Sequence, residues 1–226
     1  MIDDDSAPAS AAVAQTGRLV VDMSMSLDGF VTAAGADLDH GLGVGGEPLH
    51  AWALDAKTAA DTEIIEAAIA RTGAILMGRR TFDFVDGPNG WQGDLGYGAE
   101  GDQHAPPPAF VVTHTEPDEV RLQGRFTFVT NGLHEALANA RVAAQGKDVV
   151  VMGGGHLAHA YLEAGLVDVV VIHLAPIVLG GGTSLFASPS TATHRLELLE
   201  SVSTPAAEHL TYRVRPKPDM NDQRLH

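Results

Sequence analysis

One segment in the last third of the chain combines a buried strand, a glycine turn and a helix start. Residues 149–152 are entirely apolar, Gly153-Gly154-Gly155 follow, and residues 156–162 have a helix-like pattern. Because glycine lacks a Cβ atom, the chain can turn sharply there and a ligand can touch the backbone. The free N–H groups at a helix N-terminus favour phosphate. The segment predicts either an anion or dinucleotide site, or a glycine connection that only packs tightly.

Strand-like and helix-like segments alternate through most of the 226 residues. Three stretches have amphipathic helical spacing, each followed by a glycine that can end a helix: residues 61–70 with Gly73, 133–144 with Gly146, and 158–164 with Gly165. Eight segments are predicted strands: residues 18–24, 74–77, 109–113, 126–130, 148–152, 168–174, 195–200 and 209–215. Apolar strands indicate a sheet covered on both faces, and the alternating last two indicate an antiparallel pair. The sequence therefore predicts an α/β fold with a mostly parallel sheet.

No repeat or linker divides this alternation, so residues 17–215 are predicted to form one domain. Residues 1–16 are predicted to be a disordered tail and residues 216–226 a flexible one, because neither has a usable apolar period. Two long loops rich in Gly, Asp and Pro, residues 34–48 and 86–108, are predicted to be flaps over a site.

Composition narrows the range of partners. The formal net charge of −15 argues against a nucleic-acid surface, although a few local basic groups can still bind a small anion. The chain has no cysteine, so disulfides and thiolate chemistry are excluded. No apolar run reaches the roughly 20 residues of a membrane helix, and the acidic start is unlike a signal peptide. We expect a cytoplasmic protein with a small-molecule substrate and neither nucleic-acid nor membrane partners.

A second candidate for anion binding is Met77-Gly78-Arg79-Arg80-Thr81. A short buried strand runs into a glycine and two arginines, whose guanidinium groups bind phosphate in a forked geometry. Thr81 can cap the helix that follows. The alternative is a solvated arginine pair at a helix start.

Polar residues also end two other strands. The first predicted strand is followed by Ser26-Leu27-Asp28-Gly29, in which Asp-Gly is a common turn pair. The third predicted strand ends in Thr113-His114, two side chains that can form hydrogen bonds beside a loop.

Together these motifs resemble the dihydrofolate reductase-like family, and most closely the C-terminal reductase domain of bacterial bifunctional riboflavin biosynthesis proteins and its stand-alone homologues. The resemblance spans about residues 18–215 and rests on four segments: residues 26–29, 75–81, 153–155 and 175–186. It implies a three-layer α/β fold with a central, mostly parallel eight-stranded sheet, an antiparallel C-terminal pair and helices on both faces. Relatives commonly pair, so a homodimer is expected. The apolar residues and three glycines of residues 175–186 form either the subunit contact or an ordinary strand-to-strand loop.

The resemblance implies NADPH as the cofactor. In the family, the segment matching residues 77–81 holds the pyrophosphate and 2′-phosphate side, positions matching Thr113 and His114 contact the 2′-phosphoribose, and the glycine turn with the next helix start supports the pyrophosphate and nicotinamide. The candidate cofactor-binding residues are Ser24, Gly78, Arg79, Arg80, Thr81, Thr113, His114, Gly153, Gly154, Gly155, His156 and Leu157.

Two other ligand types are disfavoured. Gly153-x-Gly155-x-x-Ala158 fits a variant of the Rossmann fingerprint, but that motif requires an acidic residue about 20 positions on, and Asp168 comes too early. His156 and His159 are one helical turn apart, but no further ligands have a suitable spacing, so no metal is expected.

The implied chemistry is hydride transfer, in which the nicotinamide supplies the hydride and the protein orients the substrate. Dihydrofolate reductases place a carboxylate on the helix before the Met-Gly-Arg strand, and the nearest counterparts here are Asp61 and Glu63, our candidate catalytic proton donors. A solvated helix face explains both equally well. The candidate substrate-binding residues are Asp28, His50 and Trp52, with Trp91 and Tyr97 as further possibilities in the second long loop. For Trp52 the alternative is a core position.

Two functions from different classes remain open. The first is an NADPH-dependent oxidoreductase acting on a pterin, a ribosylaminopyrimidine or a related C=N or C=O compound, similar to dihydrofolate reductase or 5-amino-6-(5-phosphoribosylamino)uracil reductase. The second is a nucleotide-binding protein on the same fold without reductase activity, because a fold alone does not fix a function.

Overall fold

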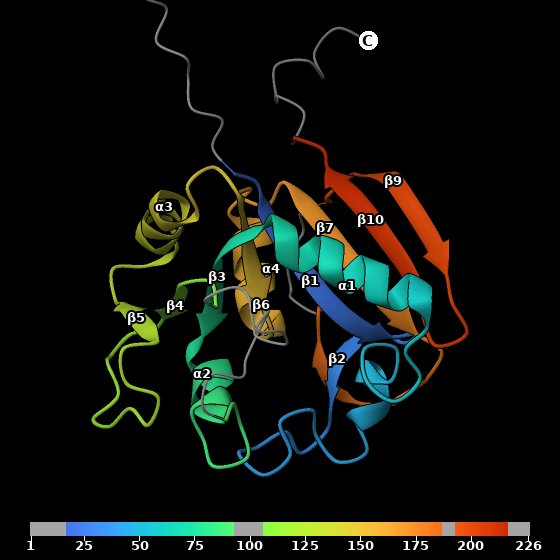
Figure 1. Ribbon diagram of the computed structural model, residues 1–226, viewed down its shortest axis with the longest axis horizontal. Coiled ribbons are helices and arrows are strands. Elements are labelled where there is room, and N and C mark those ends of the chain that lie inside the picture. Colours follow the sequence, from blue (N-terminus) through green and yellow to red (C-terminus); the bar gives the residue numbers. More distant parts are fainter. Residues whose placement is uncertain (1–16, 93–105, 187–192, 217–226) are drawn as a thin grey trace, which may run out of the picture.

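The computed structural model describes residues 17–92, 106–186 and 193–216. Eight strands form one sheet in the order β5-β4-β3-β6-β1-β7-β10-β9 (Figure 1). Their bounds are β1 (Leu19–Ser26), β3 (Thr72–Gly78), β4 (Ala109–Val112), β5 (Phe126–Val129), β6 (Asp148–Met152), β7 (Val169–Ala175), β9 (Leu196–Ser203) and β10 (Glu208–Val214). The strands from β5 to β7 are parallel, and β10 is antiparallel to both β7 and β9. The predicted mostly parallel sheet with an antiparallel C-terminal pair is therefore confirmed.

Helices cover both faces of this sheet. They are α1 (Ala59–Arg71), α2 (Arg79–Val85), α3 (Leu133–Ala144) and α4 (Gly155–Glu163). Alternate strand residues separate the faces: Val21 packs with α3 and α4, whereas Met77 packs with Phe82 of α2. The side of β1 that carries Asp22 faces α1. The predicted three-layer arrangement is confirmed.

Three short elements were not predicted because each lies within a loop. The 3-10 helix η1 (Glu47–His50) ends the first long loop, and β2 (Phe30–Ala33) pairs antiparallel with β8 (Gly182–Ser184). The first long loop packs on α2, where a Cβ atom on Gly41 would lie 2.4 Å from the Phe84 ring. Residues 93–105 of the second long loop lie outside the described residues.

Two helix boundaries differ from the prediction. Gly73 does not end α1, because the chain passes directly from α1 into β3; a Cβ atom on Gly73 would lie 2.5 Å from the Ala144 carbonyl oxygen, so close packing explains this glycine. Thr81 does not cap α2, which begins at Arg79 after the N-cap residue Gly78. By contrast, Gly165 has a φ of 69° directly after the end of α4, as predicted.

Across the described part of the chain, no helix has both the length and the apolar character needed to cross a membrane.

Candidate cofactor and substrate site

The two predicted anion-binding motifs lie against each other at the carboxyl edge of the parallel strands. The glycine turn follows β6, and α2 follows β3, the neighbouring strand (Figure 1). A Cβ atom on Gly153 would lie 3.0 Å from Thr81 Cγ2, and one on Gly154 would lie 3.1 Å from Thr81 Oγ1. Open α/β sheets bind ligands at this edge. The fold therefore joins two segments that are distant in the sequence into one surface.

The glycine turn gives α4 an uncapped start. Gly153 and Gly154 have φ values of 64° and 77°, which other residues adopt only with strain. No side chain caps α4 in the described part of the structure, and the Leu157 N–H donates to the Gly154 carbonyl oxygen (2.9 Å). The N–H groups of Gly155 and His156 are therefore the ones that this helix start leaves for a ligand. His156 is exposed there and Leu157 is buried.

Gly155 has a different environment from the two glycines before it. Its φ is not positive, and a Cβ atom on it would lie 3.1 Å from both the Ser184 carbonyl oxygen and Val31 Cγ2. Packing of α4 on the small β2–β8 sheet accounts for this residue, so the packing alternative applies to one glycine of the three.

The two arginines lie at the start of α2 and make different contacts. Arg79 is half-exposed; its Nε donates to Asp83 Oδ1 (2.7 Å) and its Nη1 donates to the Thr115 carbonyl oxygen (3.0 Å). Thr113 Oγ1 donates to the same carbonyl (2.8 Å), and His114 is exposed beside it. Arg79 and residues 113–115 thus adjoin, as a shared phosphoribose pocket requires. Arg80 is exposed and reaches the first long loop through the Ala36 carbonyl oxygen (3.5 Å).

Asp28 is engaged in holding the turn after β1. The Ser26 hydroxyl donates to its carboxylate (2.6 Å), as do the backbone N–H groups of Leu179 (3.1 Å) and Gly180 (2.7 Å). The Ser26 hydrogen bond, ahead of the two backbone bonds, lowers the pKa of Asp28. Asp28 therefore ties the end of β1 to the loop between β7 and β8, and its predicted contact with substrate stays a prediction.

Four ionisable side chains form a continuous chain on the α1 face of the sheet. Asp22 Oδ1 lies 2.9 Å from His173 Nε2, and His173 Nδ1 lies 2.7 Å from His209 Nδ1. His209 Nε2 in turn lies 2.9 Å from Asp61 Oδ1. The two carboxylates and two imidazoles come from β1, β7, β10 and α1 and are referred to below as the acid–histidine chain.

Sequence analysis identified only Asp61 of this chain. A signal for two others was present, because Asp22 and His173 each interrupt an otherwise apolar strand. A buried polar side chain in such a strand requires a hydrogen-bonding partner. Nothing in the sequence named those partners, because Asp22 and His173 are 151 positions apart and His173 and His209 are 36 positions apart.

Trp52 joins the acid–histidine chain to the end of β1. Its ring stacks on His173 with 4.0 Å between ring centroids, and its Nε1 donates to Ser24 Oγ (2.9 Å). Trp52 is buried, as the core alternative predicted, and yet lies among the candidate site residues. His50 lies nearby in η1; burial, and then the charge of His173, lower the pKa of His50. The structure therefore brings Ser24, His50 and Trp52 together.

The two predicted catalytic carboxylates have opposite environments. Asp61 is 0% exposed and accepts hydrogen bonds from the Thr58 backbone N–H (2.7 Å) and hydroxyl (2.6 Å). Burial opposes ionisation of Asp61, but the hydrogen bonds from Thr58 and His209 outweigh it and lower its pKa. Glu63 is exposed on α1. Only Asp61 belongs to the buried cluster, where it also caps α1.

The second long loop contributes no described residue to this site. Trp91 packs on Phe126 of β5 with ring centroids 6.0 Å apart, and Arg125 lies over its ring. Trp91 is thus part of the apolar cluster beside α2 and not a neighbour of Trp52. Tyr97 lies outside the described residues.

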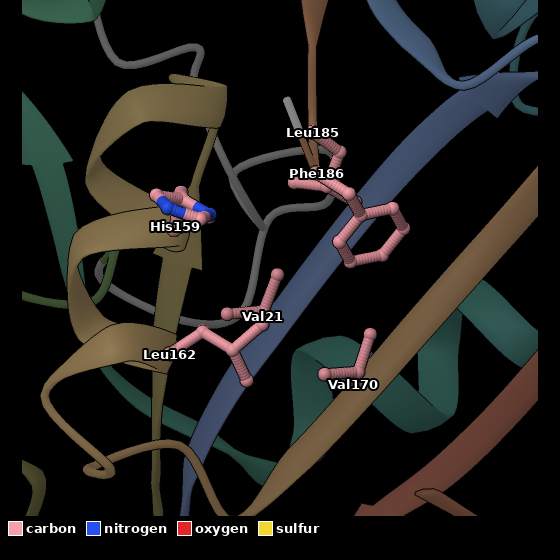
Figure 2. Close-up of a pocket in the computed structure, with 7 residues that line it drawn as sticks. Val21, His159, Leu162, Val170, Leu185 and Phe186 are labelled. Atoms are coloured by element: carbon pink, nitrogen blue, oxygen red, sulfur yellow. The ribbon is translucent and has the colours of Figure 1, made fainter. Parts of the chain in front are cut away.

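A small cavity lies on the opposite face of the sheet (Figure 2). It has a volume of about 10 Å³, and its lining includes Val21, His159, Leu162 and Leu185. Because Val21 and Asp22 point to opposite faces of β1, this cavity is separate from the acid–histidine chain. Within the described ranges, no group of three or more His, Asp or Glu side chains is arranged to hold a metal ion.

A model of the RibD C-terminal domain family matches residues 18–209. This match covers most of the sequence, and the chain belongs to that family. The resemblance inferred from the motifs is therefore confirmed.

Individual relatives agree with this assignment. Over 61 residues the chain is 43% identical to the riboflavin biosynthesis protein RibD of Corynebacterium ammoniagenes, a match that covers 27% of this chain and only 18% of that protein. A putative riboflavin biosynthesis protein from Shewanella sp. PV-4 superposes with a TM-score of 0.62 at 23% identity, covering 88% of this chain and 99% of that one. A dihydrofolate reductase from Enterococcus faecalis, complexed with NADP(H), superposes with a TM-score of 0.53 at 16% identity, covering 88% and 98%. These two superpositions establish the dihydrofolate reductase-like fold.

Proposed function

We propose that the protein is an NADPH-dependent reductase that transfers a hydride to a small heterocyclic compound with a C=N or C=O bond, of the pterin or ribosylaminopyrimidine class. The observation that carries the proposal is that Thr81 closely approaches the turn at Gly153 and Gly154, at the carboxyl edge of the sheet, where a Cβ atom on either glycine would meet it. Family membership supports a reductase-type role. The NADP(H) complex of the Enterococcus faecalis enzyme supports the choice of cofactor.

The residues at this edge suit the parts of NADPH. The uncapped start of α4 and the bare backbone at Gly153 and Gly154 would hold the pyrophosphate, since side chains at both positions would occupy the space beside Thr81. Arg79 and Arg80 would hold the 2′-phosphate, with residues 113–114 beside it. Bound NADPH supplies the hydride, and the protein supplies orientation and a proton. The substrate would lie toward Trp52 and the acid–histidine chain.

A titration tests the cofactor, and an oxidation assay then tests the reductase. NADPH should change the protein fluorescence or protect the protein from unfolding; neither effect at millimolar NADPH would refute cofactor binding. NADPH should then be oxidised in the presence of 7,8-dihydrofolate, a ribosylaminouracil phosphate or a member of a carbonyl panel. Binding without oxidation of NADPH across the panel would favour the nucleotide-binding alternative.

Replacement of Arg79 tests the 2′-phosphate assignment. We expect Arg79→Ala to weaken NADPH binding about 10-fold and NADH binding much less, because a hydrogen bond to a charged group contributes about 1.5–3 kcal/mol and only NADPH carries the 2′-phosphate. Isothermal titration with both cofactors measures the ratio. Arg213→Ala, which removes an exposed arginine of β10 paired with Glu197, is the matched control and should leave both affinities unchanged. Equal losses for NADPH and NADH in Arg79→Ala would refute the assignment.

We also infer a homodimer. The segment 175–186 carries exposed apolar side chains, among them Val178 (70% exposed) and Phe186 (47% exposed). Light scattering should give about twice the 23.6 kDa mass of one chain, and Val178→Glu should shift the protein toward one chain. A single-chain mass at micromolar concentration would contradict this inference.

A further inference from the structure

Three hydrogen bonds along the acid–histidine chain require one proton more than its two imidazoles carry when neutral. Its three contacts, of 2.9, 2.7 and 2.9 Å, are each of hydrogen-bond length. Each such bond requires one proton, an ionised carboxylate has none to give, and a neutral imidazole has one. Two neutral imidazoles supply two protons for three bonds. The third proton must therefore be bound within the chain.

The hydrogen-bond directions locate this extra proton. Asp61 already accepts from the Thr58 N–H and hydroxyl groups, so His209 donates its Nε2 proton to Asp61. Burial, the largest influence, lowers the pKa of His209, so this imidazole is neutral and its Nδ1 accepts. His173 must then donate from its own Nδ1. The extra proton is left at the remaining contact, between His173 Nε2 and Asp22 Oδ1.

That contact is at the open end of the chain. The side chain of Asp61 is 0% exposed and that of His209 is 5% exposed, whereas that of Asp22 is 19% exposed. Asp22 pairs in the sheet with Met152, the residue before the glycine turn. It also lies two residues before Ser24, on the same face of β1, where Ser24 binds Trp52. The accessible carboxylate thus adjoins the candidate cofactor edge.

We propose that the acid–histidine chain stores a proton at the Asp22–His173 contact and that Asp22 delivers it to the substrate during reduction. This inference rests on the proposed reductase function. The hydride from NADPH would bond to the carbon of the C=N or C=O group, whose π electrons form the new N–H or O–H bond with the proton from Asp22. NADPH is oxidised to NADP⁺, the substrate is reduced, and the chain recovers its proton from water. Asp22 would be the catalytic residue, and His173, His209 and Asp61 would be positioning residues.

Few other ionisable groups face this chain. His50 of η1 adjoins His173, and Glu208 precedes His209 on β10, where it accepts hydrogen bonds from the Ser201 and Ser203 hydroxyls. The other neighbours among the described residues include Thr58, Thr204, Ser24 and Trp52, and none of these titrates near neutral pH. A pH profile assigned to the chain must therefore be compared with that of His50→Gln.

Storage of the proton can be measured on the protein alone. Nitrogen NMR of the histidine rings between pH 6 and 8 should find His209 neutral and His173 protonated on Nδ1, with the Nε2 of His173 sharing a proton with Asp22. In Asp22→Asn the introduced amide can donate to Nε2, so the extra proton should be lost and the His173 resonance should move to that of a neutral acceptor. If Nε2 of His173 in the unaltered protein neither carries nor shares a proton, the proposed proton storage is refuted, regardless of the catalytic activity.

Delivery is tested by single-turnover NADPH oxidation with a compound of the panel that the unaltered protein reduces, whether 7,8-dihydrofolate, a ribosylaminouracil phosphate or a carbonyl compound. General acids contribute about 10²–10⁴-fold, so Asp22→Asn should slow hydride transfer at least 100-fold and flatten its pH profile, with the Kd for NADPH within twofold. His209→Gln, which keeps a hydrogen-bonding side chain, should shift the profile to lower pH; Asp55→Asn, an exposed carboxylate outside the chain, should change nothing. An unchanged profile in Asp22→Asn would overturn delivery alone. Failure of the unaltered protein to bind NADPH, or to oxidise it with any compound of the panel, would refute the proposed function and delivery together, while the NMR result still decides storage.

Discussion

Asp61→Ala is expected to lower the free energy of unfolding by about 3–5 kcal/mol, because an unsatisfied buried donor at His209 costs about 1–3 kcal/mol and each of the two hydrogen bonds lost from Thr58 costs about 1 kcal/mol. The Asp61 carboxylate has no contact with water and is bonded to both Thr58 and His209. Its removal leaves His209 Nε2 without an acceptor and takes away the capping box at the start of α1. Urea unfolding at pH 7, followed by circular dichroism, measures the loss.

Glu63→Ala provides the matched control on the same helix. Glu63 is exposed, so its removal should change the free energy of unfolding by no more than about 0.5 kcal/mol. If Asp61→Ala were as mild as Glu63→Ala, the acid–histidine chain would not stabilise the fold. The comparison also separates the two carboxylates that the sequence presented as equivalent.

The effect of Asp61→Ala should depend on pH in one direction. Because hydrogen bonds lower the pKa of Asp61 below its ordinary value of 3.8, the folded protein holds the ionised form more strongly than the unfolded chain does. The stabilisation is therefore complete above pH 3.8 and is lost as the pH falls through the folded-state pKa. The stability difference between the unaltered protein and Asp61→Ala should shrink on acidification, as urea titrations at pH 5 and pH 3 would measure. A difference that grows toward pH 3 would contradict this assignment.

The fold was predictable because its signals are local. Apolar runs mark the central strands, and each predicted strand overlaps an observed one. Gly73 was misinterpreted because its role is set by the end of α3, which approaches β3 from a distant part of the chain. Thr81 was misinterpreted for the same reason. It was expected to cap α2, but its position is beside Gly153 and Gly154, which come from a distant part of the chain. Local patterns locate elements, whereas tertiary contacts decide what a single residue does.

The candidate site was predictable only in part for the same reason. The glycine turn and the arginine pair are contiguous motifs, so the sequence alone was enough to propose the candidate cofactor edge. The acid–histidine chain is assembled from single residues on four elements, with His173 and Asp22 separated by 151 positions. No spacing rule connects residues at such separations. Asp22 and His173 are visible in the sequence only as polar residues in apolar strands.

The candidate cofactor edge and the acid–histidine chain have complementary roles in the proposed reaction. In the proposed function, the candidate cofactor edge would position a hydride donor, and the acid–histidine chain would supply a proton next to it. Trp52 lies between them, bonded to Ser24 and stacked on His173. The proposed proton store would have no role in a nucleotide-binding protein without reductase activity. This arrangement favours the reductase among the two functions that the sequence left open.

Gly153→Val is expected to weaken NADPH binding on the order of 100-fold. At a φ of 64° a β-branched residue is strongly disfavoured, and even a Cβ atom would lie 3.0 Å from Thr81 Cγ2. The turn must then move away from α2, and NADPH binding would have to restore the original geometry. A left-handed conformation costs a non-glycine residue about 1–2 kcal/mol, and the contact with Thr81 adds to this, giving about 3 kcal/mol in all. Isothermal titration with NADPH measures the change.

Two further variants separate this effect from general damage. Gly124→Val introduces the same residue at a φ of 77° in open space, so it should reduce stability without changing the NADPH affinity. The weaker change Gly153→Ala should be partly rescued by Thr81→Ala, because the double variant removes the methyl group that the new Cβ atom meets. Additive effects in this cycle would mean that the turn and α2 do not act as one surface. An unchanged NADPH affinity in Gly153→Val would show that the pyrophosphate does not bind at the glycine turn. The proposed function would then lose the observation on which it rests.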